Sequence, residues 1–223
     1  MLRKLFKDTI IYGIATVLPR VLTLLLTRLY VNKLDTADFG IYSGLFVYLI
    51  LGNVLLSYGM ETAFFRFMNK GEQKKKVQST ALTSLTVSSL FFLLIAYLLR
   101  HFIASWLNYD VQYIVFAIYI LVLDALVVIP FAWLRNKAKA KLYAIVKIGN
   151  TVVNLALNIY YLNYLPAETL ATNGGVYYIF LANVIASLAT FIVLLPIYFK
   201  IHFRFDYSLW KEMMVYAFPV LLA

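Results

Sequence analysis

The stretch VQYIVFAIYILVLDALVVIPFAWL (residues 111–134) decides the fold of this chain, together with RNKAKAKLYAIVK (residues 135–147), which follows it. The first run is apolar apart from a few polar side chains and one charge, Asp124, and it exceeds the ~20 residues that a helix needs to cross a bilayer. The second run is rich in Lys and Arg, as cytoplasmic loops of membrane proteins are. Together the two runs predict a membrane-spanning helix that ends at a basic cytoplasmic loop.

Five further apolar stretches predict a bundle of six membrane-spanning helices. In chain order, the expected spans are residues 9–32, 40–65, 80–99, 111–134, 143–165 and 176–199. Hydrophobic residues make up 63% of the sequence and the mean hydropathy is +0.83, which excludes an ordinary soluble domain. Because the connections are short, we expect residues 1–204 to form one all-α polytopic membrane bundle.

The last part of the sequence, residues 205–223, is expected to be an amphipathic linker followed by the start of a seventh span. Residues 205–215 alternate apolar and charged side chains, a pattern that favours a helix on the inner membrane surface. A helix beginning at Met213 would be only ~16 Å long by Ala223, at 1.5 Å per residue, and would not cross the membrane. Such a helix is either re-entrant or part of a longer protein, and we expect the longer protein.

The basic residues predict the orientation of the bundle. The sequence has 20 Lys and Arg against 10 Asp and Glu, a net charge of +10. Outside the first span they gather ahead of it and after the second, fourth and sixth spans, apart from Lys33 and Arg100. The positive-inside rule therefore predicts a cytoplasmic N-terminus. Lysines 74–76 are expected to contact anionic membrane lipids, and no aromatic-basic module points to nucleic acid.

The first span carries polar groups that are costly inside a membrane and therefore need a reason. They lie on one helical face, with Arg28 beside it: Thr16, Arg20, Thr23 and Thr27. One interpretation is a stripe that faces a water-filled cavity and accepts an anion. The other is a structural ion pair between Arg20 and Asp124, which lie at similar depth in the first and fourth spans. A proton-coupling role for Asp124 is the third alternative.

The fifth span carries a second polar stripe that runs from Lys147 to Tyr161. Its amide members are candidates for binding sugar hydroxyls: Asn150, Asn154 and Asn158. Interhelical hydrogen bonding is the alternative use of such amides. Near the predicted inner end of the second span, Glu61 and Arg66 suggest either a gate or a local salt bridge.

Catalytic, cofactor and metal sites are not expected. The sequence contains no cysteine, and its two histidines, His101 and His202, fall at opposite membrane surfaces in the predicted topology. Neither a Gly-rich phosphate loop nor a nucleophile motif occurs. Binding and transport are therefore favoured over enzymatic activity.

Four stretches resemble the polysaccharide flippases of the multidrug, oligosaccharidyl-lipid and polysaccharide exporter superfamily. They are LLLTRLYVNKLDTADFGIYSGLF (residues 24–46), YGMETAFFRF (58–67), DALVVIPFAWLRNKAKAKLYAIVKIGN (124–150) and VYAFPVLLA (215–223). The resemblance covers essentially the whole chain. It implies that the chain corresponds to the N-terminal half of such exporters, which forms one of two six-helix lobes around a central cavity.

The resemblance implies a function in surface polysaccharide export. Such flippases move undecaprenyl-diphosphate-linked oligosaccharides, including those of O-antigen and lipopolysaccharide, across the bacterial cytoplasmic membrane. It implies that Arg20 and Arg28, and more distantly Arg66, engage the lipid diphosphate. It also implies a C-terminal lobe, a polysaccharide polymerase and glycosyltransferases as partners. A multidrug exporter of the same superfamily, a non-transporting membrane scaffold and a polytopic transferase are the alternatives, and the basic first span favours an anionic substrate.

Overall fold

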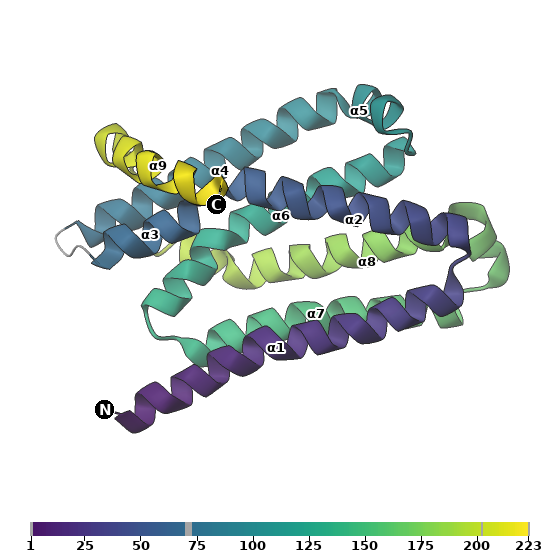
Figure 1. Cartoon of the computed structure of the whole chain (residues 1–223), viewed down its shortest axis with the longest axis horizontal. Coiled ribbons are helices and arrows are strands. Elements are labelled where there is room, and N and C mark those ends of the chain that lie inside the picture. Colours follow the sequence, from purple (N-terminus) through teal and green to yellow (C-terminus); the bar gives the residue numbers. More distant parts are fainter. Residues whose placement is uncertain (1, 70–72, 202, 223) are drawn as a thin grey trace.

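The computed structural model describes residues 2–69, 73–201 and 203–222, and its secondary structure over these residues is helical, without strands (Figure 1). The helices in chain order are α1 (Leu2–Lys33), α2 (Thr36–Ser57), α3 (Met60–Asn69), α4 (Lys74–Leu98), α5 (Arg100–Leu107), α6 (Val111–Asn136), α7 (Ala140–Tyr164), α8 (Ala167–Tyr198) and α9 (Tyr207–Leu222). The predicted all-α membrane bundle is confirmed. His202 lies outside the described residues.

Within the described residues, 6 segments are long and apolar enough to cross a membrane. They are Asp8–Lys33, Thr36–Asn69, Lys74–Leu98, Val111–Asn136, Ala140–Tyr164 and Gly174–Tyr198. These segments overlap the predicted spans over nearly their whole length. The cytoplasmic position of the N-terminus stays a prediction.

Helix α6 forms the centre of the bundle and packs against α2, α3, α4, α5, α7 and α8. This position explains why its sequence is the most apolar, since its side chains, among them Ile120, Ile129 and Leu134, are almost completely buried. Helix α1 instead packs mainly along α7, and Figure 1 shows the two side by side; α7 in turn packs closely against α8. The candidate site lies where α7 meets α3, α6 and α8, and it continues toward α1 and α2.

The second span is broken, although the sequence predicts one continuous helix over residues 40–65. Helix α2 ends at Ser57. Its C-cap residue, Tyr58, is left-handed with φ of 36° and ψ of 40°, and Gly59 follows with φ of 69°. A Cβ on Gly59 would lie 2.7 Å from the carbonyl oxygen of Ala217. The Tyr58 hydroxyl forms a 2.7 Å hydrogen bond with Ser84 of α4. The break is therefore held by contacts with α4 and α9 that lie far away in the sequence.

Helix α9 begins at Tyr207 rather than at Met213, so the predicted lead-in and the start of the predicted seventh span are one helix. The Asp206 carboxylate accepts a 3.1 Å hydrogen bond from the Leu209 amide in the first turn. The Trp210 indole donates to the Ser84 hydroxyl at 2.8 Å, and Met213 is fully buried. These contacts dock α9 onto α3 and α4.

Candidate functional site

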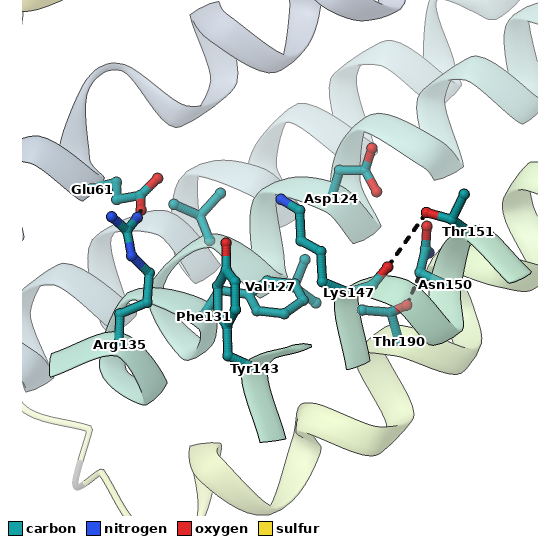
Figure 2. Close-up of a pocket in the computed structure, with 11 residues that line it drawn as sticks. Glu61, Asp124, Val127, Phe131, Arg135, Tyr143, Lys147, Asn150, Thr151 and Thr190 are labelled. Carbon is teal, nitrogen blue, oxygen red and sulfur yellow. Dashed lines mark hydrogen bonds and ion pairs between the residues drawn. The ribbon is translucent and has the colours of Figure 1, made fainter. Parts of the chain in front are cut away.

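A cavity of about 380 Å³, which we call the charged cavity, lies between α3, α6, α7 and α8 (Figure 2). Both acidic and basic side chains reach it from these helices, together with aromatic and amide groups. Its lining residues are Glu61, Asp124, Val127, Val128, Phe131, Arg135, Tyr143, Lys147, Asn150, Thr151 and Thr190. The charged cavity is thus built mainly by the stretch that decides the fold and by the start of the next span.

At one end of the charged cavity, Arg135 is paired. Its Nη1 donates a 2.7 Å hydrogen bond to Oε1 of Glu61, which is on α3. The Arg135 guanidinium also lies over the Phe65 ring, 4.8 Å from its centroid. Glu61 therefore neutralises Arg135. Of the two alternatives for Glu61 and Arg66, the local salt bridge is not formed, and the gate stays a prediction. Arg66 instead lies over the Tyr216 ring at 4.0 Å, because it faces α9.

Lys147 lies deeper in the same cavity and differs from Arg135. Its amine is 5.7 Å from the centroid of the Phe131 ring, and Figure 2 shows it between Phe131 and Asp124. Among the carboxylates that the structure describes, none approaches the Lys147 amine within 4.0 Å. An ammonium group lined by an aromatic ring and lacking a contacting carboxylate is available to an anionic ligand.

Asp124 is held by neutral donors from two other helices. Its Oδ2 accepts a 3.3 Å hydrogen bond from Nδ2 of Asn53 on α2, and its Oδ1 accepts a 2.9 Å bond from the Ser187 hydroxyl on α8. The predicted ion pair between Arg20 and Asp124 is not formed within the described residues. The reason is geometric, since Asp124 is engaged by α2 and α8 whereas α1 packs mainly along α7.

A second, smaller cavity of about 160 Å³ lies beside the first, and we call it the aromatic cavity. It is lined by Thr23, Leu26, Tyr30, Tyr42, Phe46, Asn150, Thr151, Asn154, Ile179 and Asn183. Asn150 and Thr151 line both cavities, so the two spaces meet at α7. Among the described residues that line the aromatic cavity, none is charged, in contrast to the charged cavity.

The three predicted asparagines of α7 divide between the cavities and the packed interior. Asn150 lines both cavities and its Nδ2 donates to the Thr190 hydroxyl at 2.9 Å. Asn154 lines the aromatic cavity, and its Oδ1 accepts a 2.8 Å hydrogen bond from Asn158. Asn158 is fully buried and lines neither cavity. Both of its hydrogen bonds go to Asn154 of the same helix, and its Oδ1 has no partner among the described residues, so Asn158 forms neither the expected interhelical hydrogen bond nor part of a cavity wall.

The polar stripe of α1 meets the amide stripe only at one residue. Thr23 lines the aromatic cavity with Asn150 and Asn154, as predicted. The remaining members are exposed and are not among the lining residues of either cavity: Thr16, Arg20, Thr27 and Arg28. The hydroxyls of all three threonines donate to carbonyl oxygens one turn earlier in α1, so the helix itself satisfies them.

Two pairs of lining residues were not predicted as site residues: the cations Lys147 and Arg135, and the rings of Tyr30 and Tyr42. Lys147 belongs to the same periodic stripe as Asn150, which was a signal for it. Arg135 was counted with the loop cations, because only the structure shows that its side chain turns back toward Glu61. The rings of Tyr30 and Tyr42 come from different helices and carried no signal in the sequence. Among the described residues, no cluster of three or more His, Asp or Glu side chains could hold a metal ion.

A comparison with protein families found one match that spans nearly the whole chain. Residues 5–223 match the family model described as polysaccharide biosynthesis protein. Comparisons with curated proteins and with solved structures found no match.

Proposed function

Because this chain belongs to the family of polysaccharide biosynthesis proteins, we propose that it moves a lipid-linked oligosaccharide across a membrane for surface polysaccharide export. Six apolar helices make it a multi-pass membrane protein of polysaccharide biosynthesis. The proposed cargo carries a diphosphate between its lipid and its glycan. The proposed membrane is the bacterial cytoplasmic membrane, with the N-terminus on the cytoplasmic side.

The single observation that carries the proposal is Lys147 in the charged cavity. Lys147 lies about two turns inside the span Ala140–Tyr164, so its cost in the membrane is below the ~2.5–3.5 kcal/mol that insertion scales give for a charged Lys at the centre of a spanning helix. Such a residue is by default a candidate functional residue. Its charge indicates the class of ligand, because an ammonium without a contacting carboxylate attracts an anion. The Asn150 amide lies on the same wall; one of its Nδ2 hydrogens is donated to Thr190 and the other remains for a phosphate oxygen, whereas the Thr151 hydroxyl donates to the carbonyl oxygen of Lys147.

Arg20 and Arg28 remain phosphate contacts in the proposal, but at a position outside the two cavities. Arg20 and Arg28 are exposed on α1 and carry no ion pair among the described residues. We propose that they meet the diphosphate on its way to or from the cavities rather than inside them. A further lobe, a polymerase and glycosyltransferases are the proposed partners.

A cationic drug is the competing class of ligand, and one observation favours it. Glu61 and Asp124 line the same cavity as Lys147, so the cavity carries both signs of charge. Both carboxylates already accept hydrogen bonds, from Arg135 in one case and from Asn53 and Ser187 in the other. An entering cation would have to compete with those donors. The Lys147 amine faces Asp124 at longer range but has no carboxylate of the described residues within 4.0 Å, so an anion would displace no contacting carboxylate from it.

Calorimetric titration of the chain in nanodiscs of neutral lipid, with inorganic pyrophosphate as the probe, tests the proposal. We expect binding that Lys147→Gln weakens about tenfold or more, because a charge-assisted hydrogen bond is lost. Lys141→Gln is the matched control, since Lys141 lies exposed on the same helix and outside the charged cavity. Saturable binding of ethidium without binding of pyrophosphate would overturn the proposal in favour of the drug exporter.

A further inference from the structure

The aromatic cavity has one wall of rings that come from two helices. Tyr30 of α1 and Tyr42 of α2 meet edge to face with ring centroids 4.8 Å apart, and Phe46 follows Tyr42 at 5.3 Å. Tyr30 is only 3% exposed, so this wall is fixed by packing rather than by loose side chains. Aromatic faces and edges offer an incoming ligand a rigid apolar surface.

A second part of the lining, from α7 and α8, offers hydrogen-bonding groups. Asn154 uses its Oδ1 to accept from Asn158, which leaves its own Nδ2 hydrogens for another partner. Asn183 of α8 lines the same cavity and has no hydrogen-bond partner among the residues that the structure describes. Amide groups that lack partners inside a membrane are costly, so these two favour a ligand that hydrogen-bonds.

The chemistry of the two walls together excludes several ligand classes. Its lining, over the part of the chain that the structure describes, includes neither a cation for a phosphate nor a carboxylate for a cationic compound. A lipid chain would fill the space but would leave Asn154 and Asn183 without partners. A sugar ring fits both walls, because it presents apolar C–H faces to aromatic rings and hydroxyls at its rim to amides. The volume of about 160 Å³ is below the ~300–1,000 Å³ of pockets for drug-sized ligands, which points to one ring.

We propose that the aromatic cavity is a binding subsite for a single neutral sugar ring, the ring next to the phosphate of the cargo. Its assignment to that ring rests on the proposed function, because Asn150 and Thr151 join the aromatic cavity to the charged cavity where Lys147 holds the phosphate. The inference that the ligand is a sugar rests only on the aromatic and amide residues that line the aromatic cavity. Tyr42 stacks on the ring, and Asn154 and Asn183 donate to its hydroxyls.

Saturation-transfer NMR on the chain in nanodiscs tests this subsite, with methyl glycosides of glucose, galactose and N-acetylglucosamine as probes. We expect at least one glycoside to receive saturation, with the C–H protons of one ring face receiving the most. Tyr42→Leu lowers the signal about three- to tenfold, and Tyr42→Phe, which keeps the ring, retains most of it. The matched control is Tyr48→Leu, since Tyr48 is an exposed tyrosine of the same helix outside the cavity.

A second variant and a second probe make the result decisive. Asn183→Leu keeps the volume of the side chain but removes its hydrogen bonds, so it lowers the glycoside signal and does not lower that of cyclohexylmethanol. If cyclohexylmethanol gives the same signal as the glycosides in every variant, the cavity is an apolar pocket and the subsite is refuted. The absence of saturation in all three glycosides, in a chain that binds pyrophosphate, also refutes it and leaves the proposed function standing. Glycoside binding without pyrophosphate binding has the opposite meaning, because it upholds the sugar subsite and refutes the phosphate site at Lys147.

Discussion

Arg135 on α6 and Glu61 on α3 are joined by a 2.7 Å hydrogen bond between Nη1 and Oε1 at one end of the charged cavity. Helix α3 also contacts α9 on its other side, through Arg66 over the Tyr216 ring. The short helix that follows the break in the second span therefore lies between the cavity and α9. A ligand phosphate that drew Arg135 away from Glu61 would change the contacts of α3 with both neighbours.

Replacing Glu61 tests whether it occupies the place of an anionic ligand. We expect Glu61→Gln to raise the affinity for inorganic pyrophosphate about three- to tenfold, because Arg135 loses its carboxylate and the cavity loses one negative charge. Calorimetric titration in nanodiscs measures the change. Glu212→Gln on the exposed side of α9 removes the same charge outside the charged cavity and leaves the affinity unchanged. An unchanged affinity in Glu61→Gln would mean that the ion pair does not compete with the ligand.

The break at Gly59 is expected to be intolerant of a side chain. Gly59→Ala would put a methyl group 2.7 Å from the carbonyl oxygen of Ala217 and would force a non-glycine residue to a φ of 69°. The left-handed conformation alone costs about 1–2 kcal/mol, and the backbone contact adds to it. Denaturation in mixed micelles, followed by circular dichroism, measures the loss of stability. Gly149→Ala is the control, because Gly149 is helical with nothing within 4 Å of the added Cβ, and it leaves stability equal or slightly higher. Equal stability of both variants would show that α3 and α9 do not pack closely.

The start of α9 is expected to loosen in acid. The hydrogen bond from the Leu209 amide lowers the pKa of Asp206, and Lys76, at 3.6 Å, lowers it further. A lowered carboxyl pKa stabilises the folded state above the ordinary value of ~3.9, and this contribution is lost as the pH falls through the lowered pKa. Amide hydrogen exchange of the first turns of α9, compared between the native chain and Asp206→Asn, measures it. Protection in the native chain drops toward that of the variant below about pH 4.

The same experiment has an internal control in Asp110. Asp110 precedes α6 but makes no side-chain hydrogen bond to its first turn, so Asp110→Asn does not alter the exchange of α6 amides across this pH range. A difference between Asp206→Asn and the native chain that persisted unchanged to pH 2 would contradict the assignment to this carboxylate.

Double-mutant cycles separate the partners of Asp124. Asn53 and Asp124 are hydrogen-bonded, so Asn53→Ala and Asp124→Ala are expected to couple by about 0.5 kcal/mol or more in stability. Arg20 and Asp124 form no ion pair, so Arg20→Ala and Asp124→Ala are expected to add within ~0.3–0.5 kcal/mol. Denaturation in mixed micelles measures both cycles. Strong coupling between Arg20 and Asp124 would show that the ion pair expected from the sequence is formed after all.

The sequence predicted the elements of this fold well because membrane insertion depends on local properties. Length and apolar composition are properties of single segments, and they placed the spans nearly as the structure has them, whereas the orientation drawn from loop charge stays a prediction. The break at Tyr58 and Gly59 depends instead on Ser84 and Ala217, which come from other helices. A pattern within the second span carries no information about those contacts.

Part of the candidate site was predicted, because helical periodicity is also a property of a single segment. Helical periodicity correctly placed Asn150 and Asn154 on one face, and both line cavities in the structure. Periodicity does not say which neighbour a face meets, so Arg20 was paired with Asp124 by depth alone. The burial of Asn158 also depends on neighbouring helices. In the sequence, an asparagine one turn beyond the cavity cannot be distinguished from one that lines it.

A distance measurement between the cargo and Lys147 tests the central claim most directly. The chain, with lysines labelled by ¹⁵N, is reconstituted with a polyprenyl-diphosphate-linked monosaccharide and studied by ³¹P–¹⁵N dipolar recoupling in solid-state NMR. The account predicts that the diphosphate signal is dephased by a lysine amine in contact with it, and that Lys147→Gln abolishes the dephasing while Lys141→Gln does not. Dephasing that persists undiminished in Lys147→Gln, or that is absent from the native chain with the lipid bound, would contradict the account.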